Sequence, residues 1–138
     1  MAHKKEVIRI SRGAIDLLLV EARANPNIEC CGLLGGRDGL ISAVLPAKNA
    51  LQSAKAYEIA SEELFALFRR TRAEALEHLG IYHSHPKGEN SPSPLDLERA
   101  FYPDAAYLII SPDLNASHPV RAFRIVAGRA RELPLEIV

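Results

Sequence analysis

The stretch from Tyr82 to Asp96 constrains this chain most, because it predicts a strand, an abrupt strand end and a helix start in quick succession. The apolar residues at its start predict a buried strand, on which His83 and His85 point to the same face. Pro86 is expected to end that strand, since proline has no N–H to give to a central ladder. Two imidazoles on one face can share one metal ion.

The sequence Ser93-Pro94-Leu95-Asp96 is typical of a helix start, with serine as the N-cap and proline at the first helical position. We expect the intervening loop to bring Asp96 back to the two histidines. Together with His83 and His85 it would hold one metal and leave a fourth position for water, as in catalytic zinc sites. The alternative is two ordinary histidines beside a capped helix.

Glu29 lies near the start of a second apolar run, residues 28–36, which is expected to form a short central strand. A carboxylate is costly to bury unless it is paired or used. At a solvated strand end Glu29 would need no partner. Beside a zinc-bound water, it could instead take the water's proton and pass it to a leaving amine. The residues alone leave both interpretations open.

The remaining patterns predict strands and helices that alternate along the chain. Strands are expected at 6–10, 40–45, 105–111, 119–126 and 131–138, with a short extended segment at 57–59. Helices are expected at 12–24 with Ser11 as N-cap, at 61–77 with Ser61 as N-cap and Gly80 as terminator, and at 93–101. This order predicts an α/β fold over a single domain, residues 1–138, with a mixed β-sheet flanked by helices.

Composition excludes several classes of partner. Lysine plus arginine and aspartate plus glutamate number 17 each, so no basic excess indicates nucleic acid, and no apolar run is long enough to span a membrane. Cys30 and Cys31 are adjacent and cannot staple distant segments, so a reduced, cytoplasmic protein is expected. Cys31 is expected in the core, and Cys30 could face the site. The histidines at 3, 78 and 118 lack partners at ligand spacing and are expected at the surface.

Three separated motifs resemble those of the JAMM (MPN+) zinc metallopeptidases. They are Glu29-x-Cys31-Gly32-Leu33-Leu34, Gly80-Ile81-Tyr82-His83-Ser84-His85-Pro86 and Ser93-x-x-Asp96, with seven residues between His85 and Ser93. The likeness extends over nearly the whole chain, including Asn49, residues 57–59 and residues 107–111. It is specific, because separated polar positions must coincide.

The resemblance implies a cytidine-deaminase-like fold and one zinc ion (Zn2+) held by His83, His85 and Asp96. It also implies that Glu29 is the general base and acid, and that Ser93 steadies the oxyanion of the tetrahedral intermediate. A hydroxyl aimed at a developing oxyanion is typically worth a few kcal/mol in the transition state. The sequence leaves open whether Ser93 has that role or only caps the helix.

The chain is similar to small stand-alone bacterial and archaeal members of that family. This similarity implies hydrolysis of the amide after the C-terminal Gly-Gly of a ubiquitin-like or sulfur-carrier protein of the ThiS, MoaD or CysO kind. The released group, whether a cysteine, a lysine side chain or a short tail, is left open, and so is a homodimer. The alternatives are a non-catalytic MPN-type scaffold and a zinc hydrolase of another bond. Zinc deaminases use a Pro-Cys-x-x-Cys ligand pair, whereas the cysteines here are adjacent.

Overall fold

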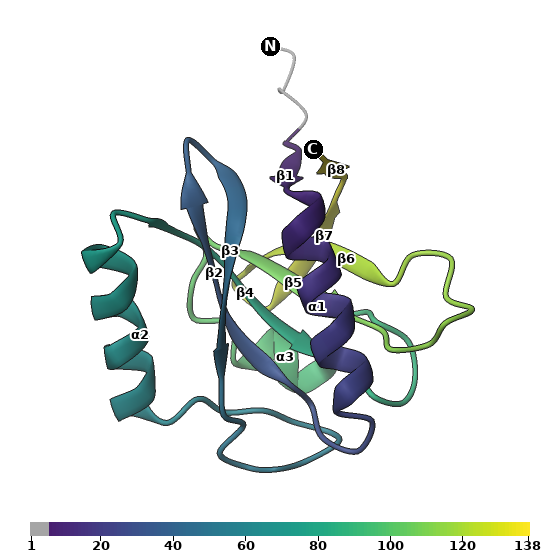
Figure 1. The fold of residues 1–138 in the computed structure, drawn as a ribbon. Helices are drawn as coiled ribbons and strands as arrows, with labels where there is room; N and C mark the ends of the chain where they lie inside the picture. Colours follow the sequence, from purple (N-terminus) through teal and green to yellow (C-terminus); the bar gives the residue numbers. More distant parts are fainter. Residues whose placement is uncertain (1–5) are drawn as a thin grey trace.

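The computed structural model describes residues 6–138 and contains an eight-stranded mixed sheet flanked by helices (Figure 1). The strands are β1 (Ile8–Ile10), β2 (Cys31–Arg37), β3 (Leu40–Ala47), β4 (Glu77–Ser84), β5 (Ala106–Ile110), β6 (Val120–Val126), β7 (Arg129–Leu133) and β8 (Leu135–Ile137). The helices are α1 (Arg12–Ala24), α2 (Ser61–Ala73) and α3 (Pro94–Glu98). The strand order is β7-β6-β5-β4-β2-β3-β1-β8, and the predicted α/β class with a mixed sheet is confirmed.

The sheet curls so far that its two edge strands are consecutive in the chain. β7 pairs with β6 and β8 pairs with β1, although only Pro134 separates them. The prediction of one strand over 131–138 is therefore wrong. Pro134 has no N–H to give to a strand ladder, so strand pairing is interrupted there. At this residue the chain passes from one edge of the sheet to the other.

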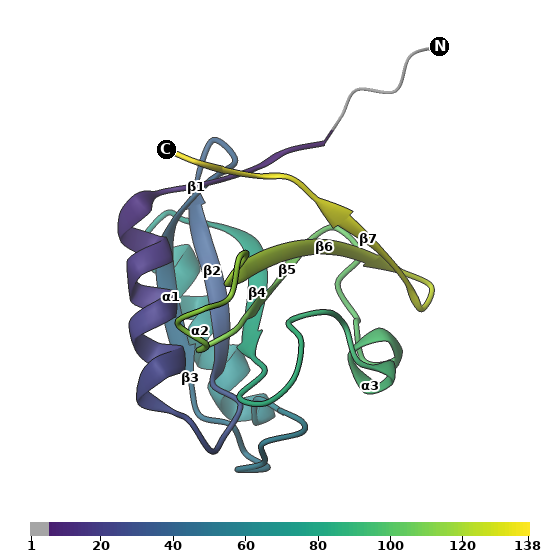
Figure 2. The same cartoon turned by 90° about the vertical axis from the view of Figure 1, so that its right-hand side faces the viewer.

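Helix α1 packs against one face of the sheet and lies at the left in the side view (Figure 2). Its predicted N-cap is confirmed, because the Ser11 hydroxyl accepts a hydrogen bond from the Ala14 N–H at 3.1 Å. Its apolar face meets side chains from strands β1 to β7, including those of Tyr82 and Leu108. The buried residues of the helix are Ala14, Ile15, Leu18 and Ala22.

Helix α2 covers the other face of the sheet, where Leu67 packs against Leu33 and Ile81. Two details differ from the prediction. Ala60, not Ser61, occupies the N-cap position and makes no side-chain cap bond. The helix ends at Ala73 because Ala75 takes the left-handed turn, with φ 56°.

Gly80 lies inside β4 and does not end a helix. A Cβ on it would approach the Ala106 carbonyl oxygen of β5 to 2.8 Å, so glycine serves close strand packing there. His78 also differs from expectation: it is half-buried, and its ring meets Phe68 and Tyr102 edge-on. His118 is exposed, as predicted, and His3 lies outside the described residues.

The central pair β2–β4 decides which side chains reach each face. On β4, Ile81 packs with the α2 side, whereas Tyr82 packs with the α1 side. A Cβ on Gly32 would come within 2.7 Å of the Tyr82 ring, so glycine in β2 makes room for it. The histidines therefore emerge on the α2 side. Within residues 6–138, no helix is both long and apolar enough to cross a membrane.

Candidate metal centre

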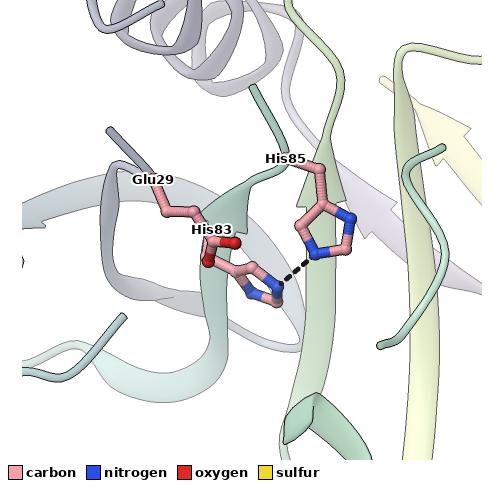
Figure 3. Close-up of side chains that lie close together, drawn as sticks. All are labelled: Glu29, His83 and His85. Atoms are coloured by element: carbon pink, nitrogen blue, oxygen red, sulfur yellow. Dashed lines mark hydrogen bonds between the residues drawn. The ribbon is translucent and has the colours of Figure 1, made fainter. Parts of the chain in front are cut away.

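His83 and His85 lie at the carboxyl end of β4, between β2 and β5. His83 belongs to the strand and is 1% exposed; His85 follows the strand and is 8% exposed. Their Nε2 atoms are 3.1 Å apart, and Figure 3 shows the two rings turned toward each other. The prediction that the two imidazoles share a face is confirmed.

Asp96 reaches this pair because α3 begins with a capping box. The Ser93 hydroxyl accepts from the Asp96 N–H at 3.1 Å, and the Ser93 N–H donates to Asp96 Oδ2 at 2.9 Å. The same Oδ2 lies 3.1 Å from both His83 Nε2 and His85 Nε2. The loop thus folds back as predicted, although α3 ends at Glu98 rather than near residue 101.

Glu29 lies just before β2 and points into the same space (Figure 3). One ligand atom from each of Glu29, His83 and His85 lies within 4.8 Å of the others. Glu29 is 3% exposed, and its Oε1 has no hydrogen-bond partner among the described residues. The open choice between a solvated and a buried carboxylate is therefore decided: Glu29 is buried beside the histidines.

The backbone fixes the ring of His85. Its Nδ1 lies 2.8 Å from the Glu89 carbonyl oxygen, which can only accept, so Nδ1 carries a proton. In the neutral ring, Nε2 then presents its lone pair to the cluster. A carbonyl that orients an imidazole in this way is common behind metal-binding histidines.

The cluster shifts the pKa values of its members in different directions. Burial lowers the pKa of His83, and Asp96 only partly opposes it. Burial also acts on His85, but hydrogen bonds to Asp96 and to the Glu89 carbonyl outweigh it and raise the pKa of that ring. Burial alone would raise the pKa of Asp96, yet the two histidines hold it well below its usual range.

Burial raises the pKa of Glu29 to about 7; the charge of His85 opposes this rise, and that of Asp96 adds to it. Glu29 therefore differs from Asp96, although both carboxyl groups border the same space. Asp96 stays ionised because it receives hydrogen bonds, whereas Glu29 is close to balance between its two protonation states near neutral pH. A carboxyl group in that balance is suited to carry a proton.

The donor set fits a metal ion. With His85 neutral, its Nε2 and Asp96 Oδ2 are both acceptors only 3.1 Å apart, an arrangement that a cation stabilises. Tetrahedral ligands about 2.0–2.1 Å from zinc lie roughly 3.3 Å from one another, close to the spacing of His83, His85 and Asp96. Glu29 with the two histidines is a second set that could hold an ion, at the longer spacing of up to 4.8 Å.

The sequence did not indicate two further contacts. The Tyr57 ring stacks on His83, with centroids 4.6 Å apart. The Asn90 side chain donates to the carbonyl oxygens of His118 at 2.8 Å and Ile109 at 3.2 Å, and so secures the loop that follows His85. Asparagine in a polar loop is too common to signal such a role, whereas the short extended segment predicted at 57–59 does single out Tyr57.

The two cysteines stay outside the cluster. Cys31 is buried opposite His83 in the strand pair, as expected for a core residue, and its Sγ contacts the Ala47 carbonyl oxygen at 3.8 Å. Cys30 faces the α1 side, where it belongs to the core with Tyr82. Cys30 therefore does not face the site.

Comparison with known proteins identifies the family of this chain. The family described as "Prokaryotic homologs of the JAB domain" matches residues 11–126. The CysO-cysteine peptidase of Mycobacterium tuberculosis is 31% identical over 134 residues, which cover 96% of this chain and 92% of the relative. The desampylase of Haloferax volcanii is 34% identical over 113 residues, 77% of this chain and 81% of the relative.

A solved structure from Desulfitobacterium hafniense has a TM-score of 0.81 and 31% sequence identity, and the match covers 96% of this chain and 93% of that one. Fold and cluster thus define a JAB-type α/β protein with a candidate metal centre. The chain belongs to the prokaryotic JAB-domain family, and the predicted relation to JAMM proteins is confirmed.

Proposed function

We propose that the protein is a zinc-dependent peptidase that cleaves the amide bond after the C-terminal Gly-Gly of a ubiquitin-like or sulfur-carrier protein. The observation that carries this proposal is the triangle of His83, His85 and Asp96 with the buried Glu29 carboxylate beside it. The similarity to a CysO-cysteine peptidase and a desampylase supports the same class of reaction.

In this proposal His83, His85 and Asp96 hold one zinc. Asp96 is preferred to Glu29 as the third ligand, because Oδ2 lies 3.1 Å from both imidazole nitrogens. Two nitrogens and one oxygen are a common catalytic zinc set, which leaves a fourth position free. When bound, zinc polarises a carbonyl and makes a water more acidic.

Glu29 is the proposed proton carrier. Its Oε1 is buried without a hydrogen-bond partner in the described part of the chain, so it is free to accept a proton from the attacking water. Burial raises the pKa of Glu29, which helps the carboxyl group hold that proton until the leaving amine takes it up. The carboxylate thus acts first as a base and then as an acid.

Ser93 is the proposed oxyanion donor, and its capping bond does not compete with that role. A hydroxyl has two lone pairs and one proton. The Asp96 N–H uses one lone pair, so the proton remains available for a second partner. Ser93 can therefore cap α3 and donate to a developing oxyanion, a contact worth a few kcal/mol in the transition state.

A mainly apolar groove beside the cluster supports an extended glycine-rich substrate. The groove has a volume of about 190 Å³, and its wall includes Asp96 together with Tyr57, Ile59, Ile81 and Tyr107. A chain without side chains, such as Gly-Gly, suits a space of this size next to the cluster. Extended peptides commonly bind proteins in this strand-like form.

The rival functions fit less well. A scaffold would not need a buried carboxylate with a free oxygen beside two histidines. In a zinc deaminase a cysteine pair would be expected near the ion, whereas Cys30 lies on the opposite face of the sheet. A cytidine-deaminase-like fold, a cytoplasmic location, a homodimer and the 1–138 domain bounds stay predictions.

The experiment that tests this function combines elemental analysis with a cleavage assay. The substrate is a sulfur-carrier protein extended beyond Gly-Gly, and the control carries Ala-Ala at the same positions. We expect one zinc per chain and cleavage after Gly-Gly that a chelator abolishes and zinc restores. Zinc without cleavage would refute the substrate class, and absence of zinc from metal-replete protein would refute the centre itself.

A further inference from the structure

Asn49 lies outside the metal cluster, at the start of the loop between β3 and α2. Its side chain is buried and uses its full hydrogen-bonding capacity. Nδ2 donates to the carbonyl oxygens of Glu29 at 3.0 Å and Ala56 at 2.9 Å. Oδ1 accepts from the N–H groups of Leu51 at 3.0 Å and Glu58 at 3.2 Å.

These bonds join two segments that each contribute to the cluster. One segment carries Glu29, whose N–H also donates to the Ser53 carbonyl oxygen at 2.8 Å. The other carries Tyr57, which lies between two of the Asn49 partners and stacks on His83. One side chain thus links the backbone of the proposed proton carrier to the residue that covers a proposed zinc ligand.

The link matters because no hydrogen bond from the described residues holds Glu29 Oε1. The place of this group therefore depends on its backbone. Glu29 precedes β2, and its backbone N–H and C=O bond to the loop rather than to a neighbouring strand. Asn49 and Ser53 provide those two bonds.

We propose that Asn49 is a positioning residue that fixes Glu29 relative to the metal ligands. The inference rests on the proposed function, in which Glu29 moves the proton. A displacement of about 1 Å in a catalytic group can cost roughly 100-fold in rate. Loss of Asn49 should therefore reduce kcat.

The test compares Asn49→Ala with Asn25→Ala, which removes a side-chain bond to the Glu21 carbonyl oxygen at the end of α1. We expect Asn49→Ala to lower kcat about 10- to 100-fold with zinc content unchanged. Asn25→Ala should leave kcat within about 2-fold. If Asn49→Ala does not fold, Asn49→Ser takes its place, because its hydroxyl adds no charge and has only one proton, so it cannot donate to the carbonyl oxygens of both Glu29 and Ala56.

A double-mutant cycle separates positioning from general stability. In a Glu29→Gln background there is no proton carrier left to misplace, so Asn49→Ala should cost less than about 2-fold in residual turnover. Full additivity of the two losses would overturn the inference, because it would mean that Asn49 acts independently of Glu29.

Amide hydrogen exchange supplies a readout that needs no substrate. In Asn49→Ala the amides of Glu29 and Glu58 should exchange at least about 10-fold faster, while those of β4 stay unchanged. Unchanged exchange at Glu29 would overturn the inference. If the wild-type protein is inactive on every Gly-Gly substrate, the proposed function fails, and the exchange result still decides whether Asn49 holds Glu29.

Discussion

The polar side chains on the two faces of β4 differ in whether they have hydrogen-bond partners. On the α1 side the Tyr82 hydroxyl donates to Glu21 Oε1 at 2.6 Å, and the Ser84 hydroxyl accepts from the Cys30 N–H at 2.9 Å. Each of these polar groups has a partner, although Tyr82 and Ser84 are fully buried. This is the usual condition of polar groups inside a protein.

On the α2 side, polar atoms are crowded together or lack partners. His83 Nε2 lies 3.1 Å from both His85 Nε2 and Asp96 Oδ2, and Glu29 Oε1 is buried without a hydrogen bond among the described residues. An unsatisfied buried group costs about 1–3 kcal/mol. Tyr82 and Ser84, the neighbours of His83 in β4, have hydrogen-bond partners, so the fold can satisfy polar groups at this place. An unsatisfied carboxylate on the other face therefore indicates a site for a ligand. The satisfied face stabilises the fold, and the unsatisfied face is arranged for chemistry.

The largest effect is expected from Asp96→Ala, which removes one corner of the triangle. Metal affinity should fall by more than the roughly 10- to 100-fold typical of outer-shell changes, and cleavage should be lost. Elemental analysis and the cleavage assay measure both. Glu98→Ala removes an exposed carboxylate from the same helix and serves as the control. Full zinc content in Asp96→Ala would contradict the ligand assignment.

Glu29→Gln should separate metal binding from proton transfer. The amide keeps the shape of the carboxyl group but cannot accept the proton, so kcat should fall about 10²- to 10⁴-fold while zinc is retained. Steady-state kinetics and zinc content on the same preparation check this prediction. Turnover equal to that of the wild type would remove Glu29 from the reaction.

Ser84→Ala probes the satisfied face directly between the two histidines. The substitution leaves the Cys30 N–H buried without a partner, so the free energy of unfolding should fall by about 1–3 kcal/mol. Zinc content should stay unchanged, and kcat should stay within about 3-fold, since the side chain points away from the cluster. Loss of zinc in this variant would show that the two faces are not independent. Denaturant unfolding and elemental analysis decide the outcome.

The smallest effect is expected from Tyr82→Phe, and it should depend on pH. Burial raises the pKa of Glu21, and the Tyr82 hydrogen bond opposes that rise. The folded protein therefore binds this proton more tightly than the unfolded chain, so stability falls as pH rises through the interval between the two pKa values. In Tyr82→Phe the pKa of Glu21 in the folded protein rises further. The loss of stability with rising pH then becomes larger.

For Tyr82→Phe we expect a loss of about 1 kcal/mol near neutral pH and a smaller loss in acid, where Glu21 is protonated in both states. Urea unfolding at several pH values measures the difference. A loss that is equal at every pH would show that the hydroxyl does not interact with the charged form of Glu21.

Local patterns in the sequence determined much of the site. The His-x-His spacing placed both imidazoles on one face, and the Ser93 capping box brought Asp96 to them. Ser11 and the apolar spacing that follows it determined α1. These features depend on strand alternation and on hydrogen bonds between residues three or four apart, so the order of residues suffices to predict them.

Only the tertiary structure decided which residues surround His83, His85 and Asp96. Pairing of β2 with β4 buries Glu29 beside the histidines, and Asn49 links its backbone to the loop that carries Tyr57. The sequence also did not predict that the last segment divides at Pro134 into β7 and β8, which lie at opposite edges of the sheet. Such contacts join segments far apart in the chain. Their energies depend on which strands become neighbours, and no local pattern contains that information.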